Sequence, residues 1–134
     1  MVHKIGLSDL VKDFQFPPVS YSIDSAKVSA YIKAVEDSNS IYHEEQCVPP
    51  MAAAALAMAA MGQQMSLPAG SIHVSQEFSF KNTISIGDTL TSRASILRNI
   101  ERGKIHMLTI GINITNQRNE TVVSGETGFI LPRA

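Results

Sequence analysis

The chain has 134 residues, which fits one compact domain and leaves no room for two ordinary ones. Hydrophobic residues make up 44% of it but aromatic residues only 6%, so the core must be built from aliphatic side chains, Ala and six Met. Eleven Lys and Arg face twelve Asp and Glu, and this near-neutral balance argues against a nucleic-acid partner. The single Cys47 cannot form an internal disulfide, and no signal-like segment opens the sequence, so we expect a cytoplasmic protein. The longest apolar run, residues 51–61, is too short for a membrane span, which needs about 20 residues.

The first third of the chain predicts an arm, a strand and a helix. Residues 1–18 are expected to form an arm or short helix that docks on the domain, and residues 19–23 alternate in the period of two typical of a half-buried strand. Asp24 or Ser25 then offers a helix N-cap. The apolar residues of this helix form one amphipathic stripe: Val28, Tyr31, Ile32 and Val35.

A second helix is indicated by Pro49 and Pro50, because proline is tolerated in a first helical turn. Residues 51–61 are all Ala, Leu or Met, which are strong helix formers. This helix has no polar face, so we expect it to be buried on all sides.

The rest of the chain predicts strands, over residues 71–80, 90–100, 104–115 and 121–131. The last three are joined by short turns and predict an antiparallel meander. These pieces fit one α+β domain over residues 1–134, in which a curved antiparallel sheet wraps around the buried Ala/Met-rich helix, the architecture called the hot-dog fold. Such a sheet leaves an edge open in a monomer, so we expect a dimer.

The polar segment 36–45 concentrates the reactive side chains of the sequence. Its candidate catalytic residues are Asp37, Asn39, Tyr42 and His43. The apolar helix begins just after it, and its N-terminus carries partial positive charge that could hold a developing enolate oxygen. The candidate substrate-binding residues are Val48, Pro50, Met51 and Met58.

This segment resembles the MaoC-like family of hot-dog hydratases and dehydratases. The family signature is Asp, any residue, Asn, usually Pro, an aliphatic residue and then His, and Asp37, Asn39 and Ile41 match its first, third and fifth places. The resemblance extends over roughly residues 19–132 and includes the Gly-Asp-Thr-Leu turn at residues 87–90.

The resemblance implies hydration of a trans-2-enoyl thioester, or the reverse dehydration, by a (R)-specific lyase. It implies that Asp37 and His43 share the catalytic water, that Asn39 orients them, and that coenzyme A or acyl carrier protein carries the acyl chain. No cofactor or metal is expected. The implied partners are the acyl thioester and a second MaoC-like chain, in a homodimer or a heteromer, with no nucleic acid and no membrane.

Two positions depart from the family pattern and support an alternative. Tyr42 stands where the family has His, and His43 follows one residue later. Pro49 and Pro50 stand where catalytic members tend to carry His-Gly, and Pro50 has no N–H to give to a thioester oxygen. The alternative is a non-catalytic acyl-binding subunit whose partner chain supplies the catalytic Asp and His.

Plainer roles also fit these residues. Asp37 could end the first helix, Asn39 could form a turn, Tyr42 could pack, and His43 could be a solvated loop residue. Met58 could belong to the core rather than to an acyl tunnel. We expect His73 and His106 to lie on the surface, on the strand faces opposite the apolar ones. Basic residues near the turns are candidates for coenzyme A phosphates or simply exposed charges: Lys81, Arg93, Arg98, Arg102 and Lys104. A thioesterase is disfavoured, because residues 51–65 contain no carboxylate.

Overall fold

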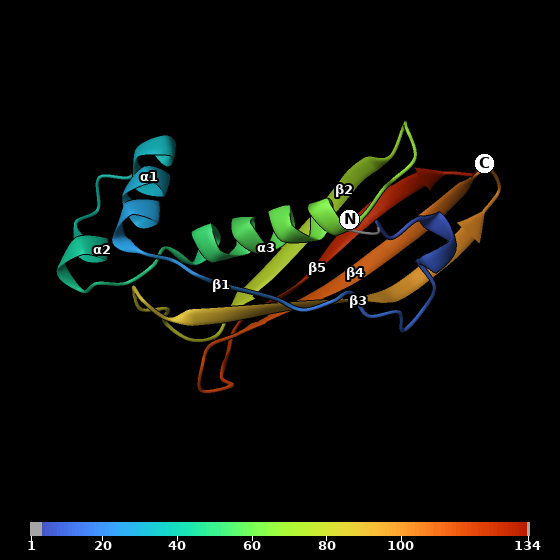
Figure 1. The fold of residues 1–134 in the computed structure, drawn as a ribbon. Helices are drawn as coiled ribbons and strands as arrows, with labels where there is room; N and C mark the ends of the chain where they lie inside the picture. The colour runs from blue at the N-terminus through green and yellow to red at the C-terminus, as the bar shows by residue number, and fades with distance from the viewer. Residues whose placement is uncertain (1–3, 134) are drawn as a thin grey trace.

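The computed structural model describes residues 4–133, so residues 1–3 and 134 of the predicted domain lie outside the described residues. One five-stranded sheet forms, with the strand order β1-β3-β4-β5-β2 and antiparallel pairing throughout (Figure 1). Its strands are β1 (Val19–Ser22), β2 (Ile72–Phe80), β3 (Thr89–Arg102), β4 (Ile105–Thr115) and β5 (Thr121–Pro132). The structure confirms the predicted strands, including the meander of β3, β4 and β5. It also confirms the α+β hot-dog architecture.

Four helical segments accompany the sheet: η1 (Leu7–Asp9), α1 (Ser25–Val35), α2 (Ile41–Glu44) and α3 (Pro50–Gln64). Asp24 caps α1 as predicted, because its carboxylate accepts the Lys27 N–H at 2.8 Å. The sequence did not predict α2, whose four residues are too few to show a helical period. In Figure 1, α3 lies along one face of the curved sheet, and α1 and α2 sit together at its N-terminal end.

The core fills the space between α3 and the sheet. The helix contributes small side chains such as Ala53 and Ala57, both at most 1% exposed, which let the sheet approach closely. Strand β4 supplies the facing layer, where every second residue is buried: Leu108, Ile110, Ile112 and Ile114. The buried Ala residues of the helix therefore lie where helix and sheet meet.

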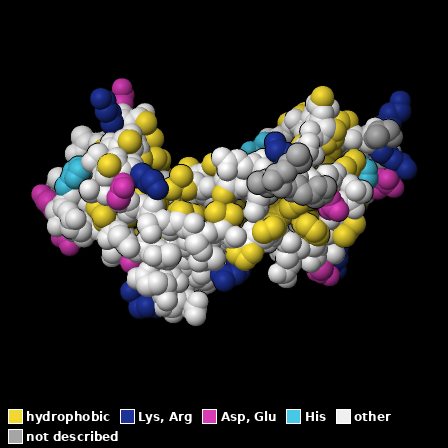
Figure 2. Space-filling model, viewed as in Figure 1, with side chains coloured by type: hydrophobic (Ala, Val, Ile, Leu, Met, Phe, Trp, Pro, Cys, Tyr) yellow, Lys and Arg dark blue, Asp and Glu magenta, His cyan; other side chains and the backbone are white. Residues whose placement is uncertain are grey.

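The prediction that α3 is buried on all sides is wrong. Met51 is 45% exposed, and Ala55 and Ala59 are also exposed. Five strands curve past only one side of the helix, so its other side faces solvent in the single chain. Apolar side chains are accordingly visible across the middle of the molecule in Figure 2, where α3 lies.

The N-terminal arm docks on the domain, as predicted. Leu10 is fully buried and Phe16 is 3% exposed, so both belong to the core. Ile5 forms a bridge to Met65 at the end of α3, and Gln15 forms one to Ser95 in β3. The arm therefore closes the core at the C-terminal end of α3.

The Gly-Asp turn before β3 has a structural role. Gly87 has a φ of 96°, a left-handed conformation that favours glycine. Asp88 is buried, and its carboxylate accepts hydrogen bonds from the Ser85 N–H and from Gln117 Nε2, each at 2.9 Å. These bonds fix the loop between β2 and β3, whose first residues line the hollow at the N-terminal end of α3 described below.

Candidate functional site

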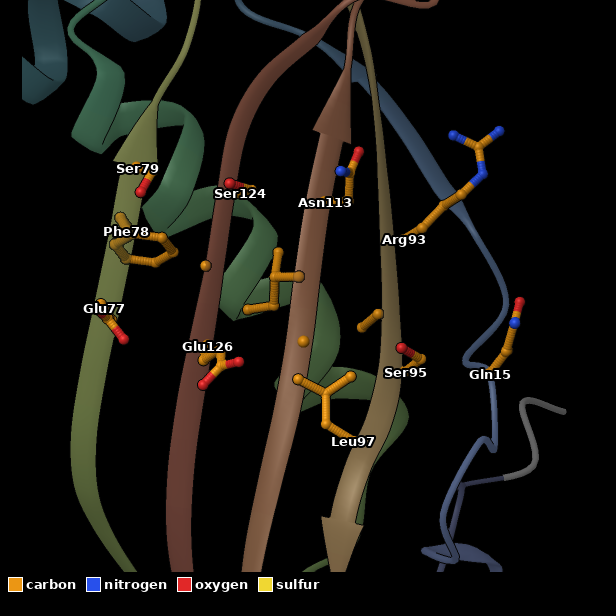
Figure 3. A pocket seen from close by; sticks show the side chains of 14 residues that line it. Gln15, Glu77, Phe78, Ser79, Arg93, Ser95, Leu97, Asn113, Ser124 and Glu126 are labelled. Atoms are coloured by element: carbon orange, nitrogen blue, oxygen red, sulfur yellow. The ribbon is translucent and has the colours of Figure 1, made fainter.

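One hollow, with a volume of about 580 Å³, lies on the sheet face turned away from α3 (Figure 3). Its polar lining consists of Ser, Asn and Gln side chains and a few ions, with no His, Tyr or Cys. Glu126, one of those ions, lies 3.8 Å from Arg98, and both side chains are about half exposed, at 47% and 55%. Solvated ions of this kind are poorly suited to proton transfer, so we do not place the chemistry here.

A second hollow, of about 490 Å³, lies at the N-terminal end of α3 and has the size of a small-molecule site. The segment from α1 to α3 forms one wall, and the end of β2 with the turn that follows it forms the other. Its lining residues are Asn39, Ile41, Tyr42, Cys47, Val48, Pro50, Phe80, Lys81, Asn82, Thr83 and Ile84. Four of the eight predicted site residues therefore line it.

Two consecutive side-chain turns shape the loop between α1 and α2. Glu36, with a φ of 56°, ends α1, so Asp37 is not its cap residue. Asp37 Oδ1 instead accepts the Asn39 N–H at 2.9 Å, and Asn39 Oδ1 accepts the Ile41 N–H at 3.0 Å. Asn39 thus meets Asp37 through its backbone and uses its side chain to start α2.

Tyr42, rather than His43, is the side chain brought towards Asp37. The phenol is half-buried against the core, and its pKa is raised, first by burial and then by the negative charge of Asp37. His43 is exposed, because neighbouring residues of a helix point about 100° apart. Its carbonyl oxygen accepts a hydrogen bond from Gln46 Nε2 at 2.8 Å.

The other four predicted site residues do not line the hollow: Asp37, His43, Met51 and Met58. Met51 is largely exposed on α3, and Met58 packs against the core. Among the basic candidates, Lys81 lines this hollow and Arg93 lines the larger one on the other face. Phe80 was not predicted as a site residue, because no motif marks it and only the sheet topology brings the end of β2 to α3.

The two strand histidines differ from expectation. His106 is partly buried, with 17% of its side chain exposed and Nδ1 at 3.1 Å from Asn99 Oδ1. His73 is exposed as expected but lies on the sheet face that carries α3, where its Nε2 is 2.7 Å from Thr127 Oγ1. The cause is an irregularity in β2 between His73 and Ser75, which interrupts the alternation of its side chains.

Within residues 4–133, no group of three or more His, Cys, Asp or Glu could hold a metal ion. No helix of that range is both long and apolar enough to span a membrane.

Comparison with known families finds one match. The family described as the FAS1-like, dehydratase domain region matches residues 12–124. A comparison with curated proteins finds no match.

Solved structures with similar folds include several hydratases and dehydratases. A (R)-hydratase from A. caviae involved in PHA biosynthesis is 26% identical, with a TM-score of 0.79 over 92% of this chain and 98% of that one. The R-hydratase PhaJ1 from Pseudomonas aeruginosa is 19% identical, with a TM-score of 0.80 over 95% of this chain and 85% of that one. The HadBC (3R-hydroxyacyl-ACP dehydratase) complex from Mycobacterium tuberculosis is 16% identical, with a TM-score of 0.67 over 89% and 96% of the two chains.

Proposed function

The chain belongs to the FAS1-like dehydratase domain family, and on that premise we propose that it adds water to an enoyl thioester or removes water from a 3-hydroxyacyl thioester. The observation that carries the proposal is the place of Tyr42 in the wall of the hollow beside the N-terminus of α3, close enough to Asp37 for that carboxylate to raise the pKa of the phenol. Asp37 matches the first position of the MaoC-like signature quoted above. The similar (R)-hydratases support (R)-stereochemistry.

In the hydration direction, Asp37 would take a proton from water while the water oxygen bonds to the β-carbon of the enoyl group. Electron density moves to the thioester oxygen, and the α-carbon then receives a proton. Because its pKa is raised, the Tyr42 phenol is protonated at neutral pH and would give its proton to the α-carbon. When the product leaves, the proton that Asp37 took from water would pass to the Tyr42 oxygen and restore both groups. Dehydration is the same sequence reversed.

The wall of the hollow supplies the other contacts. Pro50 has no N–H, so Met51 offers the first free N–H of α3 to the thioester oxygen. Lys81 at the end of β2 is the basic residue placed to meet a phosphate of coenzyme A or of acyl carrier protein. Val48 and Phe80 give the acyl chain apolar surface.

The test is a direct assay of the purified chain with trans-2-enoyl thioesters of several lengths, beginning with crotonyl-CoA. We expect loss of the enoyl absorbance and a (R)-3-hydroxyacyl product by chiral chromatography. Release of free thiol measured in parallel would reveal thioester hydrolysis instead. An absence of turnover with every chain length would sink the proposal that this chain is catalytic alone.

A second function, that of a non-catalytic acyl-binding subunit, is favoured by two observations. Pro50 removes an N–H from the site, and His43 points to solvent. The similar HadBC structure is a complex of a dehydratase. Under this alternative the purified chain is inert and gains activity only when it is co-expressed with a chain that carries the complete Asp and His motif.

A further inference from the structure

We propose that Asp88 and Gln117, a hydrogen-bonded pair outside the hollow at the N-terminal end of α3, position the first turn of α3 for the reaction. They are positioning residues rather than catalytic ones, because neither lines the hollow. The inference rests on the proposed function of that hollow and names two further residues on which its rate depends. Three sets of hydrogen bonds connect the pair to the first turn of α3.

Asp88 and Gln117 join two segments that are distant in the chain, the loop between β2 and β3 and the turn between β4 and β5. Gln117 Nε2 donates to Asp88 Oδ1 at 2.9 Å, and Gln117 Oε1 accepts the Thr89 N–H at 3.0 Å. The other oxygen of Asp88 accepts the Ser85 N–H at 2.9 Å. Asp88 is only 8% exposed, and a carboxylate in such a place needs these donors. Both oxygens of Asp88 and both polar atoms of Gln117 are therefore engaged, which leaves one orientation for the Gln117 amide.

The pair also closes the loop that forms one wall of the hollow. The Asp88 N–H donates back to the Ser85 carbonyl oxygen at 3.0 Å, so residues 85–88 form a closed turn. Ile84, immediately before this turn, lines the hollow and is 1% exposed. The pair thereby fixes the end of this wall against the core.

A short ladder carries this position to α3. Residues 46–48 pair with residues 84–86 in an antiparallel bridge, through two N–H···O bonds of 2.8 Å each. Val48 is buried and directly precedes the two prolines at the start of α3, whose fixed φ angles make Val48 and the first helical turn move together. The Met51 N–H, the proposed donor to the thioester oxygen, therefore keeps its place only while residues 84–86 keep theirs.

The donors and acceptors of the pair can be exchanged. In Asp88→Asn one acceptor oxygen becomes an NH2 group, so either the Ser85 N–H or the Gln117 NH2 loses its acceptor. In Gln117→Glu two carboxylates face each other. The double variant Asp88→Asn/Gln117→Glu moves the donor to position 88 and the acceptor to position 117, so the bonds to each other, to Ser85 and to Thr89 can all form again.

The first test is a double-mutant cycle on the hydration of crotonyl-CoA. Each single variant, folded by circular dichroism, should have a kcat lower by about tenfold, and the double variant should return to within about threefold of the wild-type value. KM should change little, because the backbone of Lys81 is held separately by the Val122 carbonyl oxygen at 2.8 Å. Lower stability at an unchanged kcat in the single variants, or a double variant no faster than they are, overturns the proposal.

Two variants in the turn between β4 and β5 complete this test. Gln117→Ala removes an exposed side chain without adding a clash, so it should fold and should also lower kcat. Glu120→Gln is the matched control, because the hydrogen bonds of Glu120 stay within its own turn. It should keep the wild-type kcat, and a loss as large as that of Gln117→Ala would overturn the proposal.

The second test needs no turnover. Cys47, the single cysteine of the chain, lies in the segment 46–48 that pairs with the loop and is partly buried. Its alkylation by iodoacetamide should be several-fold faster in Asp88→Asn and should return to near the wild-type rate in the double variant. Equal rates in the wild type and both single variants overturn the proposal. If the wild type does not hydrate crotonyl-CoA but the alkylation rates follow the cycle, the proposed function fails while the positioning of this segment by the pair stands.

Discussion

Replacing Tyr21 with Phe should change the pH dependence of stability. Tyr21 in β1 donates a hydrogen bond from Oη to the Ala53 carbonyl oxygen at 3.2 Å and so ties the sheet to the first turns of α3, beside the candidate site. Burial raises the pKa of this phenol to about 12 from an ordinary value of 10.0. The phenolate is therefore disfavoured in the folded protein relative to the unfolded chain.

The sign and size of the effect follow from linkage. Below pH 10 both states hold the proton and Tyr21 adds no pH dependence; between pH 10 and 12 the unfolded chain loses the proton first, so stability falls as pH rises. At 1.36 kcal/mol per pKa unit the loss at pH 11 is about 1.4 kcal/mol as an upper figure, because part of the ring remains in contact with solvent. Tyr21→Phe lacks this loss but gives up a hydrogen bond worth about 1 kcal/mol at every pH.

Urea unfolding from pH 7 to pH 11.5 would check this. The wild type should be more stable by about 1 kcal/mol at pH 7, and the two curves should converge and meet near pH 11. Other titrating groups are common to both proteins and cancel in the difference. Parallel curves across the whole range would refute the reasoning.

Four further predictions separate the roles of individual residues. Tyr42→Phe removes the proposed proton donor and should lower kcat about 100-fold or more, without changing the urea midpoint by more than a small amount; an unchanged kcat would exclude the phenol from proton transfer. His43→Ala should leave hydration within a factor of about two, since the side chain is exposed, and a large loss of kcat would return His43 to the site. Lys81→Met should raise KM for coenzyme A thioesters several-fold at unchanged kcat, which a KM equal to the wild-type value would contradict. Gly125→Ala places a methyl group against the Glu77 carbonyl oxygen and should lower the free energy of unfolding in urea by about 3 kcal/mol. The control Gly62→Ala has open space around it and should not destabilise α3. Equal stability of these two variants would be the contrary result.

Periodicity and turn residues were enough to predict the sheet and both long helices. The alternation in β4 and the Pro-Pro start of α3 are local signals, and their consequences are local too. The openness of α3 was missed, because a run of Ala, Leu and Met says that a surface is apolar but not whether this chain or another covers it. Helix α2 was missed because it is a single turn.

In the candidate site, too, the sequence predicted what local signals determine and missed what the packing of distant segments determines. The motif led to Asp37 and Asn39, and the structure gives them a loop that begins α2. Which of Tyr42 and His43 faces the hollow depends on the phase of that short helix, which no sequence period reveals. Phe80 and Lys81 reach the hollow only because β2 lies beside β5 at the sheet edge, a pairing between segments distant in the chain. His73 was assigned to the wrong sheet face because the irregularity near Val74 has no clear sequence signal.

The most direct test of the proposed function is the rate of crotonyl-CoA hydration by the wild type and by Asp37→Asn at the same enzyme concentration. The account predicts turnover by the wild type and a loss of kcat of about 100-fold or more in the variant, with both proteins equally folded by circular dichroism. Equal rates in the two proteins would contradict it, because the carboxylate that takes the proton from water would then lie elsewhere.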